Sequence, residues 1–392
     1  MNVLLMKWKG LGMEDMTEAL TFLGHKVTFY EFSDEHLHAD EKTEKEIKSA
    51  LINSSADLIF SFNYYPILAK ICHDNDCPYF SWVYDSPTVL LYNYSLVYPT
   101  NHVFLFDYET YSEFKNNGIN TVYYMPLAAN PRRLQALFED PVSKNAYENS
   151  SQKNKNDIAF VGSLYTEKHT FYDRLRDISP YTRGYLEGIM NVQKNIYGVN
   201  IIQKLLTNEI MDDMKKNLPL SPDPQGVETR EYLFAEYVIN RKITAIERTE
   251  ILNLIGSKYK YDLYTPDTKV NFPGAINHGP VDYLTMTPFV FNRAKINLNI
   301  TLRSIHVGIP LRAFEIIGCG GLLLSNYQPG FEDCFTAGEE YVPYESTDDL
   351  LFKIDYLLSH EDERKEIALN GYNRLVKEHT YDHRINEMLS YL

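Results

Sequence analysis

The sequence predicts an α/β protein with two doubly wound parallel sheets, the second interrupted by a long helical insertion. Three observations lead to this fold class. Short, continuous apolar runs alternate with helical patterns through the first third of the chain, which is typical of parallel strands buried on both faces. A second series of the same kind resumes in the C-terminal half. The length of 392 residues suits two or three domains of ordinary size.

The first domain is expected to span residues 1–150. Its predicted strands begin with the apolar run NVLLMKW at residues 2–8, and a helical pattern over residues 13–23 stops at Gly24. Ligands of such a sheet bind beyond the carboxyl ends of its strands, so the residues that follow each run are the candidates for chemistry. The other predicted strands are residues 26–32, 57–62, 78–84, 102–106 and 122–125.

The second domain is expected to span residues 151–375. The polar stretch SKNAYENSSQKNKND, residues 143–157, predicts a linker before it. A helical insertion is expected from about residue 170 to 255, where it would shape an acceptor site or a homodimer contact. Residues 376–392 are expected to form a C-terminal helix that packs back on the first domain. The predicted strands are residues 158–161, 261–264, 294–300 and 321–325, and the predicted helices are residues 348–358 and 361–377.

Composition excludes several classes of protein. The formal charge of -15 argues against a general nucleic-acid binder, because affinity for a phosphate backbone comes from Lys and Arg. Hydrophobic residues at 44% and charged residues at 23% exclude a long disordered chain. No apolar stretch is long enough to predict a membrane span, and the first apolar run is too short for a signal peptide. The four cysteines lack C-x-x-C spacing, so we expect reduced thiols and a cytoplasmic protein.

The segment GIPLRAFEIIGCGG, residues 308–321, is the most informative part of the chain. It predicts a helix over residues 310–317 that begins with a proline and ends at glycines. Arg312 and Glu315 are three residues apart and therefore share one face. Arginine suits a phosphate oxygen, and a glutamate suits two adjacent hydroxyls such as those of a ribose. The alternative is an ordinary surface ion pair.

Two further groups are candidates for donor binding. Gly162, Ser163 and Tyr165 follow a predicted strand, where small residues let backbone N–H groups approach a phosphate; an ordinary turn is the alternative. Asn297 and Asn299 lie on one face of the strand AKINLNI, where their amides need either a sugar or a backbone partner. Gly320 and Gly321 let the chain turn tightly after the helix. The loop residues His278 and His306 are expected to be solvated.

Asp85 is the candidate catalytic residue of the first domain. It follows the apolar run PYFSWVY directly, where a parallel sheet presents its functional residues. A carboxylate there can take the proton of an acceptor hydroxyl. The alternative is a capping role, with Asp85 or Ser86 before a helix that begins at Pro87. Asp107 ends the next strand and has the same two interpretations.

Several segments resemble GT-B glycosyltransferases, in particular the spore-maturation CgeB-like group. The likeness covers most of the chain apart from residues 167–253, and the order of the motifs is more specific than any one of them. The segments that carry it are SWVYDSP at residues 81–87, residues 102–131, DIAFVGSLY at residues 157–165, AKINLNI, residues 308–335, GEEYV at residues 338–342, and residues 360–389.

The resemblance implies two Rossmann-like domains that face each other across a cleft, with the nucleotide-sugar donor on the second. It also implies that no metal is bound, since helix dipoles and cationic side chains hold the diphosphate. The family role of the Arg-x-x-Glu helix falls on Arg312 for the diphosphate and Glu315 for the ribose. The chain departs from the retaining pattern at Leu323, eight residues after Glu315, where a second glutamate is frequent.

The expected activity is therefore transfer of a sugar from a nucleotide-sugar donor, with UDP-sugars favoured, to a hydroxyl of a glycan, a protein or a small molecule. No cofactor is expected, because the nucleotide sugar is a substrate. Two alternatives remain open at this point. One is a non-catalytic cytoplasmic protein that binds a sugar or nucleotide with the same fold, and the other is a nucleotide-sugar epimerase.

Overall fold

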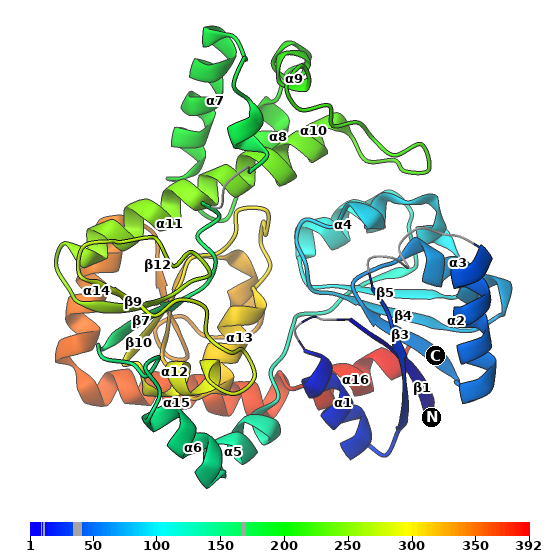
Figure 1. The fold of residues 1–392 in the computed structure, drawn as a ribbon, viewed down its shortest axis with the longest axis horizontal. Helices are drawn as coiled ribbons and strands as arrows, with labels where there is room; N and C mark the ends of the chain where they lie inside the picture. The colour runs from blue at the N-terminus through cyan, green and yellow to red at the C-terminus, as the bar shows by residue number, and fades with distance from the viewer. Residues whose placement is uncertain (9, 11, 34–40, 167–169) are drawn as a thin grey trace. The chain divides into compact units, whose positions relative to one another are not determined.

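The computed structural model describes residues 1–8, 10, 12–33, 41–166 and 170–392 (Figure 1). Across these residues the predicted class, α/β with two doubly wound parallel sheets, is confirmed. No helix in the described ranges combines the length and apolar character needed to cross a membrane.

The chain forms two compact units. Unit 1 consists of Met1–Asn130, Pro222–Glu228 and His379–Leu392. Unit 2 consists of Pro131–Ser221 and Thr229–Glu378. The chain therefore starts in unit 1, builds unit 2, and returns to unit 1 at its C-terminal end.

The sheet of unit 1 has six parallel strands in the order β2-β1-β3-β4-β5-β6. Every residue of β3 and β4 is buried, which explains why these runs lack polar alternation. The strand order reverses between β1 and β3, and the carboxyl ends of strands at such a switch point favour ligand binding. The strands are β1 (Asn2–Lys7), β2 (Lys26–Glu31), β3 (Leu58–Phe62), β4 (Tyr79–Val83), β5 (Asn101–Leu105) and β6 (Val122–Tyr124).

Helices of unit 1 begin where the sequence offers a proline or a capping side chain. Pro66 occupies the first turn of α3, and the Asp107 carboxylate accepts the Glu109 N–H at the start of α4. The C-terminal helix α16 packs against α1, and Arg384 of α16 donates to the Pro126 carbonyl at 2.8 Å. The helices are α1 (Met13–Phe22), α2 (Glu41–Ser54), α3 (Pro66–Asp74), α4 (Tyr108–Asn116), α16 (Tyr381–Leu389) and the 3-10 turns η2 (Val89–Tyr92) and η3 (Tyr94–Val97).

The sheet of unit 2 also has six parallel strands, in the order β12-β11-β10-β7-β8-β9. Its order reverses between β7 and β10, so the loops that follow these two strands meet at the switch point. The core beneath includes Phe160, Leu263 and Leu298, each almost completely buried. The strands are β7 (Ile158–Val161), β8 (Tyr261–Tyr264), β9 (Ala275–Asn277), β10 (Ile296–Asn299), β11 (Leu323–Asn326) and β12 (Val342–Tyr344).

Helices on the sheet of unit 2 include α12 and α13, which pack against each other, and α15, which packs on α13. Two of the helices, α5 and α6, precede the first strand of the sheet. The helices outside the insertion are α5 (Pro131–Glu139), α6 (Pro141–Glu148), α12 (Thr287–Arg293), α13 (Leu311–Gly318), η6 (Pro329–Asp333), α14 (Thr347–Ser359) and α15 (Glu361–Glu378).

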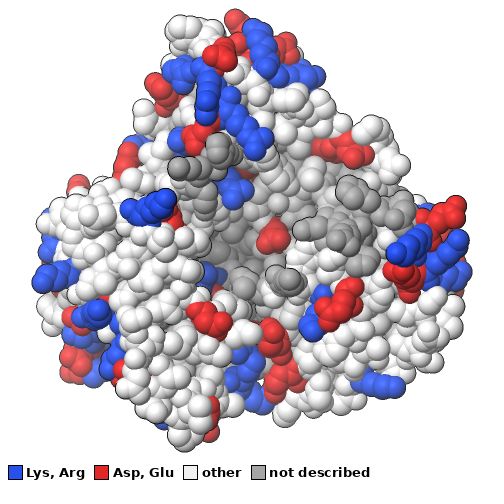
Figure 2. All heavy atoms as spheres, viewed as in Figure 1, with Lys and Arg blue, Asp and Glu red and all other residues white. Residues whose placement is uncertain are grey.

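The expected helical insertion lies between β7 and β8 and has a hydrophobic core of its own. Leu186, Phe234 and Ile243 are fully buried members of that core. Figure 2 shows Lys and Arg interspersed with Asp and Glu over these helices, at the top of the view, as on an ordinary solvated surface. The helices are η4 (Tyr172–Arg174), α7 (Pro180–Gln193), α8 (Ile202–Leu205), α9 (Asn208–Lys215), α10 (Arg230–Phe234), the π-helical turn η5 (Ala235–Ile239) and α11 (Asn240–Gly256).

The polar stretch at residues 143–157 is not a linker, and that prediction was wrong. It completes α6 and then satisfies the fully buried carboxylate of Asp262 in β8. The backbone N–H groups of Lys155 and Asn156 donate to Asp262 Oδ2 at 2.8 and 2.7 Å, and His278 Nε2 lies 2.7 Å from Oδ1. Most of its polar side chains are exposed or half-buried, and composition alone does not distinguish such a segment from a flexible linker.

Candidate functional site

The candidate site lies in unit 2, at the carboxyl ends of the strands on either side of the switch point. The loop Gly162–Tyr165 follows β7, and residues 300–310 follow β10 and lead into α13. A parallel sheet places such loops at one edge, so residues from distant parts of the sequence meet there.

Helix α13 carries the charged pair predicted from the sequence. The helix begins at Leu311, with Pro310 just outside it in an extended conformation, one residue later than expected. Arg312 Nη1 lies 3.2 Å from Glu315 Oε2. Gly320 then adopts a left-handed conformation with φ 72°, which ends the helix and turns the chain toward β11.

The Arg312–Glu315 pair is sheltered and differs from an ordinary surface ion pair. The two side chains are only 24% and 13% exposed. The Arg312 guanidinium lies 5.3 Å from the ring centroid of Phe291, and Tyr283 donates a hydrogen bond to Glu315 Oε1. Among the described residues, neither Arg312 Nη1 nor Glu315 Oε2 has a hydrogen-bond partner of good geometry. Unsatisfied polar atoms on a sheltered pair are what a ligand with phosphate and hydroxyl groups would complete.

In the loop after β7, the N–H of Gly162 is not available to a phosphate. The Gly162 N–H donates to the Tyr264 carbonyl at 2.9 Å, so it is already used by the sheet edge. The Ser163 hydroxyl accepts the Tyr165 N–H at 3.2 Å, and Tyr165 has a left-handed backbone with φ 55°. The Ser163–Tyr165 hydrogen bond makes the loop a tight turn, as the alternative interpretation expects.

Arg248 of α11 is a residue that the sequence did not single out. It is 8% exposed and joins the two loops of the switch point, donating from Nη1 to the Ser163 carbonyl and from Nε to the Ile300 carbonyl at 3.1 Å. Burial lowers the pKa of Arg248, and the nearby charge of Arg312 acts in the same direction. Burial has the larger effect, and the like charge of Arg312 adds to it.

The ring of Tyr165 faces two cations. The guanidinium carbons of Arg241 and Arg248 lie 4.9 and 5.0 Å from its centroid. The attraction between each guanidinium and the face of the ring helps to hold these side chains in place. Cation–aromatic pairs between a loop and a helix more than seventy residues away leave no local signal, which is why neither arginine was predicted.

The two asparagines of β10 are bound to the protein itself. Asn297 donates from Nδ2 to the Phe291 carbonyl at 2.9 Å. Asn299 donates to the hydroxyls of Thr301 at 3.0 Å and Ser325 at 2.9 Å. Both residues are at most 4% exposed. These protein contacts use the Nδ2 group of each asparagine, as the backbone-partner alternative expects, and the Oδ1 of Asn297 is buried without a hydrogen-bond partner among the described residues.

The packing around Gly321 and Leu323 explains which residue types these two positions accept. A Cβ at Gly321 would lie 2.6 Å from Asn297 Nδ2 and 2.6 Å from the Phe291 carbonyl oxygen, so only glycine fits. Leu323 is the first residue of β11 and is 1% exposed. It is therefore a buried apolar residue of unit 2.

A second buried polar network supports the loop after β10. Arg303 Nε and Nη2 donate to the two carboxylate oxygens of Glu247, each at 2.8 Å. His306 Nε2 lies 3.0 Å from Glu236 Oε1, within the π-helical turn η5. The expectation that His278 and His306 are solvated was wrong, since their side chains are 3% and 17% exposed and both pair with carboxylates. The Arg303–Glu247 and His306–Glu236 pairs hold the loop that leads into α13.

In unit 1, Asp85 follows β4 and is held by Asn63, which follows β3. Asn63 Nδ2 donates to Asp85 Oδ2 at 2.6 Å, and Asn63 Oδ1 accepts the N–H groups of Tyr84 and Asp85 at 2.9 and 3.0 Å. Asp85 is exposed as a residue, yet burial of its carboxyl group raises its pKa above the usual value. The hydrogen bond from Asn63 lowers the pKa in part.

The capping alternative for Asp85 is wrong, whereas the one for Asp107 is right. The helical turn after Asp85 begins only at Val89, with Thr88 before it, and Pro87 lies outside that turn. The Asp107 Oδ1 accepts the Glu109 N–H at 3.0 Å and caps α4. Within the part of unit 1 that the structure describes, Asp85 caps no helix, whereas Asp107 does.

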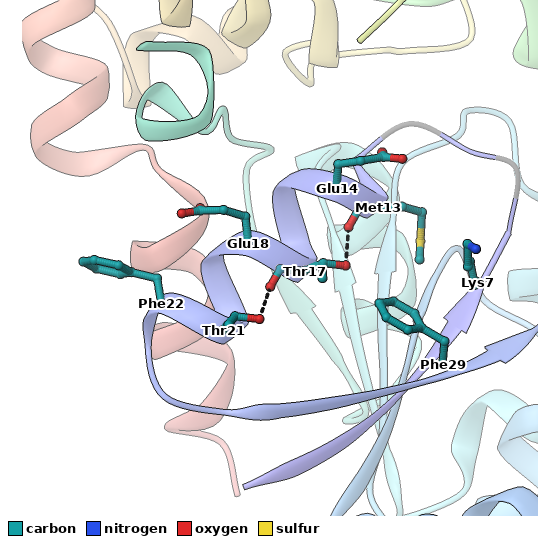
Figure 3. A pocket seen from close by; sticks show the side chains of 8 residues that line it. All are labelled: Lys7, Met13, Glu14, Thr17, Glu18, Thr21, Phe22 and Phe29. Carbon is teal, nitrogen blue, oxygen red and sulfur yellow. Dashed lines mark hydrogen bonds between the residues drawn. The ribbon is translucent and has the colours of Figure 1, made fainter. Parts of the chain in front are cut away.

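Unit 1 also has a hollow of about 560 Å³ between α1 and the strands β1 and β2 (Figure 3). The Thr17 hydroxyl donates to the Met13 carbonyl and the Thr21 hydroxyl to the Thr17 carbonyl, each at 2.7 Å, so these hydroxyls are used within the helix. Lys7 is paired with Glu31 at 3.0 Å. The lining comes mainly from the side of α1 and from β2, and the hollow is not part of the candidate site.

Comparison with known proteins agrees with this geometry. Residues 240–390 match a family model described as "Glycosyl transferase-like". That span contains Arg248, Tyr283 and the Arg312–Glu315 pair, and it excludes the loop after β7 and Asp85. No curated protein matches the chain by sequence.

Solved glycosyltransferases share the fold over the whole chain. A glycosyltransferase from Rickettsia africae gives a TM-score of 0.52 at 11% identity, covering 100% of this chain and 97% of that one. HepE of Anabaena in complex with UDP and glucose gives 0.51 at 10% identity, covering 100% of each chain. Trehalose-6-phosphate from Escherichia coli bound with UDP-2-fluoro glucose gives 0.54 at 11% identity, covering 100% and 98%. At these identities the likeness establishes the fold, which is that of GT-B glycosyltransferases.

Proposed function

We propose that the protein is a glycosyltransferase that moves a sugar from a nucleotide-sugar donor, with UDP-sugars favoured, to a hydroxyl of an acceptor. The sheltered Arg312–Glu315 pair carries the proposal, because it lies at the carboxyl edge of a doubly wound sheet and within the matched glycosyltransferase segment. The full-length likeness to GT-B structures, one of them in complex with UDP and glucose, supports it. We further assign the chain to the CgeB-like group, on the segments quoted from the sequence.

The donor nucleotide would bind unit 2. Glu315 is an acceptor for the two ribose hydroxyls, and Arg312 together with Arg248 supplies positive charge for the diphosphate. In the reaction an acceptor oxygen forms a bond to the anomeric carbon while the bond from that carbon to the diphosphate oxygen breaks. The electron pair leaves with the nucleoside diphosphate, whose growing charge the two guanidinium groups stabilise. On this proposal these groups take the place of a bound metal.

The acceptor would bind unit 1, and Asp85 is the proposed general base. Its carboxylate takes the proton that the acceptor hydroxyl loses, and Asn63 holds the carboxylate in place by a 2.6 Å hydrogen bond. The acceptor is a glycan, a protein or a small molecule. All four cysteines are buried and outside disulfides, which supports a reducing, cytoplasmic setting.

The test is a panel of UDP-, GDP- and dTDP-sugars incubated with the purified protein, alone and with candidate acceptors. We expect release of nucleoside diphosphate from one donor class and thermal stabilisation by the same nucleotide. Glu315→Ala should lose the stabilisation while circular dichroism shows the fold intact. Failure of folded protein to respond to any donor would contradict the proposal. Binding without turnover would instead favour a non-catalytic protein, and conversion of the donor sugar without an acceptor would favour an epimerase.

A further inference from the structure

We propose that Tyr283 is a positioning residue that holds the Glu315 carboxylate for the donor ribose and so gives the site its preference for ribonucleotides. Tyr283 lies in the turn between β9 and α12, outside every segment that the sequence pattern singled out. The inference rests on the proposed function and names the chemical feature of the nucleotide that this part of the site recognises.

Two different side chains hold the two oxygens of the Glu315 carboxylate. The Tyr283 hydroxyl donates to Oε1, and Arg312 Nη1 lies 3.2 Å from Oε2. A carboxylate oxygen can accept more than one hydrogen bond, so each oxygen keeps capacity for a ligand hydroxyl. The two oxygens of one carboxylate then match the two adjacent hydroxyls of a ribose, whereas a 2′-deoxyribose would leave one of them unmatched.

The position of Tyr283 is itself fixed by a tight turn. The neighbouring Asp282 accepts the Thr285 N–H at 2.8 Å and the Thr285 hydroxyl at 2.6 Å. The Asp282 carbonyl accepts the Thr287 N–H at 2.9 Å, at the first residue of α12. The two hydrogen bonds from Thr285 to the carboxylate also hold the pKa of Asp282 below its usual value. The phenol is thus placed by the backbone before any ligand arrives, which lowers the cost of ordering the site.

The same segment supports the other half of the pair. Phe291 of α12 lies beneath the Arg312 guanidinium, 5.3 Å from ring centroid to guanidinium carbon. The turn and helix at residues 282–293 therefore hold both Arg312 and Glu315 from one side. Because a phenol is neutral, it orients the carboxylate without cancelling the negative charge that makes Glu315 a strong acceptor.

Without the Tyr283 hydroxyl, the strongest remaining partner of the carboxylate is Arg312. We expect the carboxylate to rotate toward the guanidinium and to form a two-point ion pair. Both oxygens would then be engaged by the same cation, and their directions would no longer match two adjacent hydroxyls. A merely structural role for Tyr283 would weaken binding of all nucleotides alike, since phosphate contacts would suffer equally.

The test is isothermal titration of the full chain with UDP and with 2′-deoxy-UDP, and with GDP and 2′-deoxy-GDP as a second pair. The variants are Tyr283→Phe and Glu315→Gln. The matched control is Tyr356→Phe, which removes a Tyr-to-Glu hydrogen bond of 2.6 Å between α14 and α15, remote in sequence from the candidate site. The readout is the ratio of the ribo to the deoxyribo affinity, which a general loss of stability does not change.

We expect the wild type and Tyr356→Phe to prefer the ribonucleotide by about tenfold or more, as for a hydrogen bond to a charged group. Tyr283→Phe should bring that ratio close to one while the affinity for the deoxynucleotide changes little, and Glu315→Gln should do the same. An unchanged ratio in Tyr283→Phe, with the wild type selective, would overturn the inference and leave the proposed function intact. Failure of the wild type to bind any nucleotide of either pair would overturn both.

Discussion

Asn63 shows how a single side chain can prepare a carboxylate for chemistry. Its backbone lies in the left-handed region with φ 61°, which asparagine tolerates better than most residues. From there its amide binds two backbone N–H groups at the end of β4 and the Asp85 carboxylate. The arrangement opposes the effect of burial, which raises the pKa of Asp85. Burial has the larger effect, so the pKa of Asp85 stays above its usual value.

A pH profile tests the role of Asp85. Only the ionised carboxylate can accept a proton, so kcat/KM should fall as the pH drops through the raised pKa of Asp85. Asn63→Ala removes the hydrogen bond that lowers this pKa, so its acid limb should move to higher pH. Asp85→Asn should lower kcat about 10²–10⁴-fold and abolish the acid limb. The pH dependence of sugar transfer by the three proteins is the measurement, and an acid limb that Asn63→Ala leaves in place would contradict the assignment.

At the scale of elements, α12 and α13 form the donor side as a pair. Helix α13 carries Arg312 and Glu315, and α12 with its preceding turn supplies Phe291 and Tyr283 against them. The connection from α13 to β11 passes so close to α12 that no side chain fits at Gly321. The geometry of the charged pair therefore depends on close packing between the two helices and the strand beneath them, which requires a glycine at position 321.

Gly321→Ala should test this packing. The new methyl group would lie 2.6 Å from both Asn297 Nδ2 and the Phe291 carbonyl, so we expect a loss of about 1–3 kcal/mol in the free energy of unfolding. Gly184→Ala is the matched control, because its Cβ would meet nothing within 4 Å inside α7. That control should be neutral or stabilise by up to about 1 kcal/mol. Denaturant unfolding measures both, and equal stability of the two variants would refute the packing argument.

At the scale of the whole molecule, the chain leaves unit 1 at Asn130 and returns to it at His379. The returning segment is well anchored there. Tyr381 is 1% exposed and its hydroxyl accepts a hydrogen bond from Tyr84 at 2.8 Å, while Arg384 binds the Pro126 carbonyl. Unit 1 therefore lacks part of its core until the last residues of the chain are in place.

A truncation after Glu378 tests how much unit 1 depends on the C-terminal segment. It removes α16 and exposes the face of α1 on which that helix packs. We expect unit 1 to unfold at a lower temperature and unit 2 to keep its melting transition and its nucleotide binding. Calorimetry with and without UDP measures both transitions, and removal of Leu392 alone, which is 54% exposed, is the control. Loss of both transitions together would show that unit 2 depends on α16 as well.

The sequence was sufficient for most of the architecture. Fully buried parallel strands such as β3 and β4 appear as continuous apolar runs, and the i, i+3 spacing of Arg312 and Glu315 placed them on one helical face. The fold class predicted from these patterns is confirmed, and the matched glycosyltransferase segment supports the expected activity.

What the sequence did not reveal depends on contacts between distant segments. Tyr283 and Arg248 have no local pattern, because their partners lie 32 residues away or more. Asn297 and Asn299 were assigned to a ligand because a strand pattern cannot show that a backbone carbonyl and two hydroxyls already accept hydrogen bonds from their Nδ2 groups. The polar stretch before β7 resembled a linker because the buried Asp262 that it binds comes more than a hundred residues later.

Because the chain returns to unit 1, unit 2 resembles a domain inserted into unit 1. The chain enters unit 2 after Asn130 and leaves it before His379, and Ala129 and Thr380, next to these two joints, form a β-bridge. Only the short segment Pro222–Glu228, which pairs with Tyr92 and Tyr94, interrupts this arrangement. A chimera is therefore feasible in which a related donor-side domain replaces residues 131–378 and brings its own counterpart of the segment Pro222–Glu228. Evolution could exchange nucleotide specificity between such proteins by recombination at the same two joints, while the acceptor side is retained.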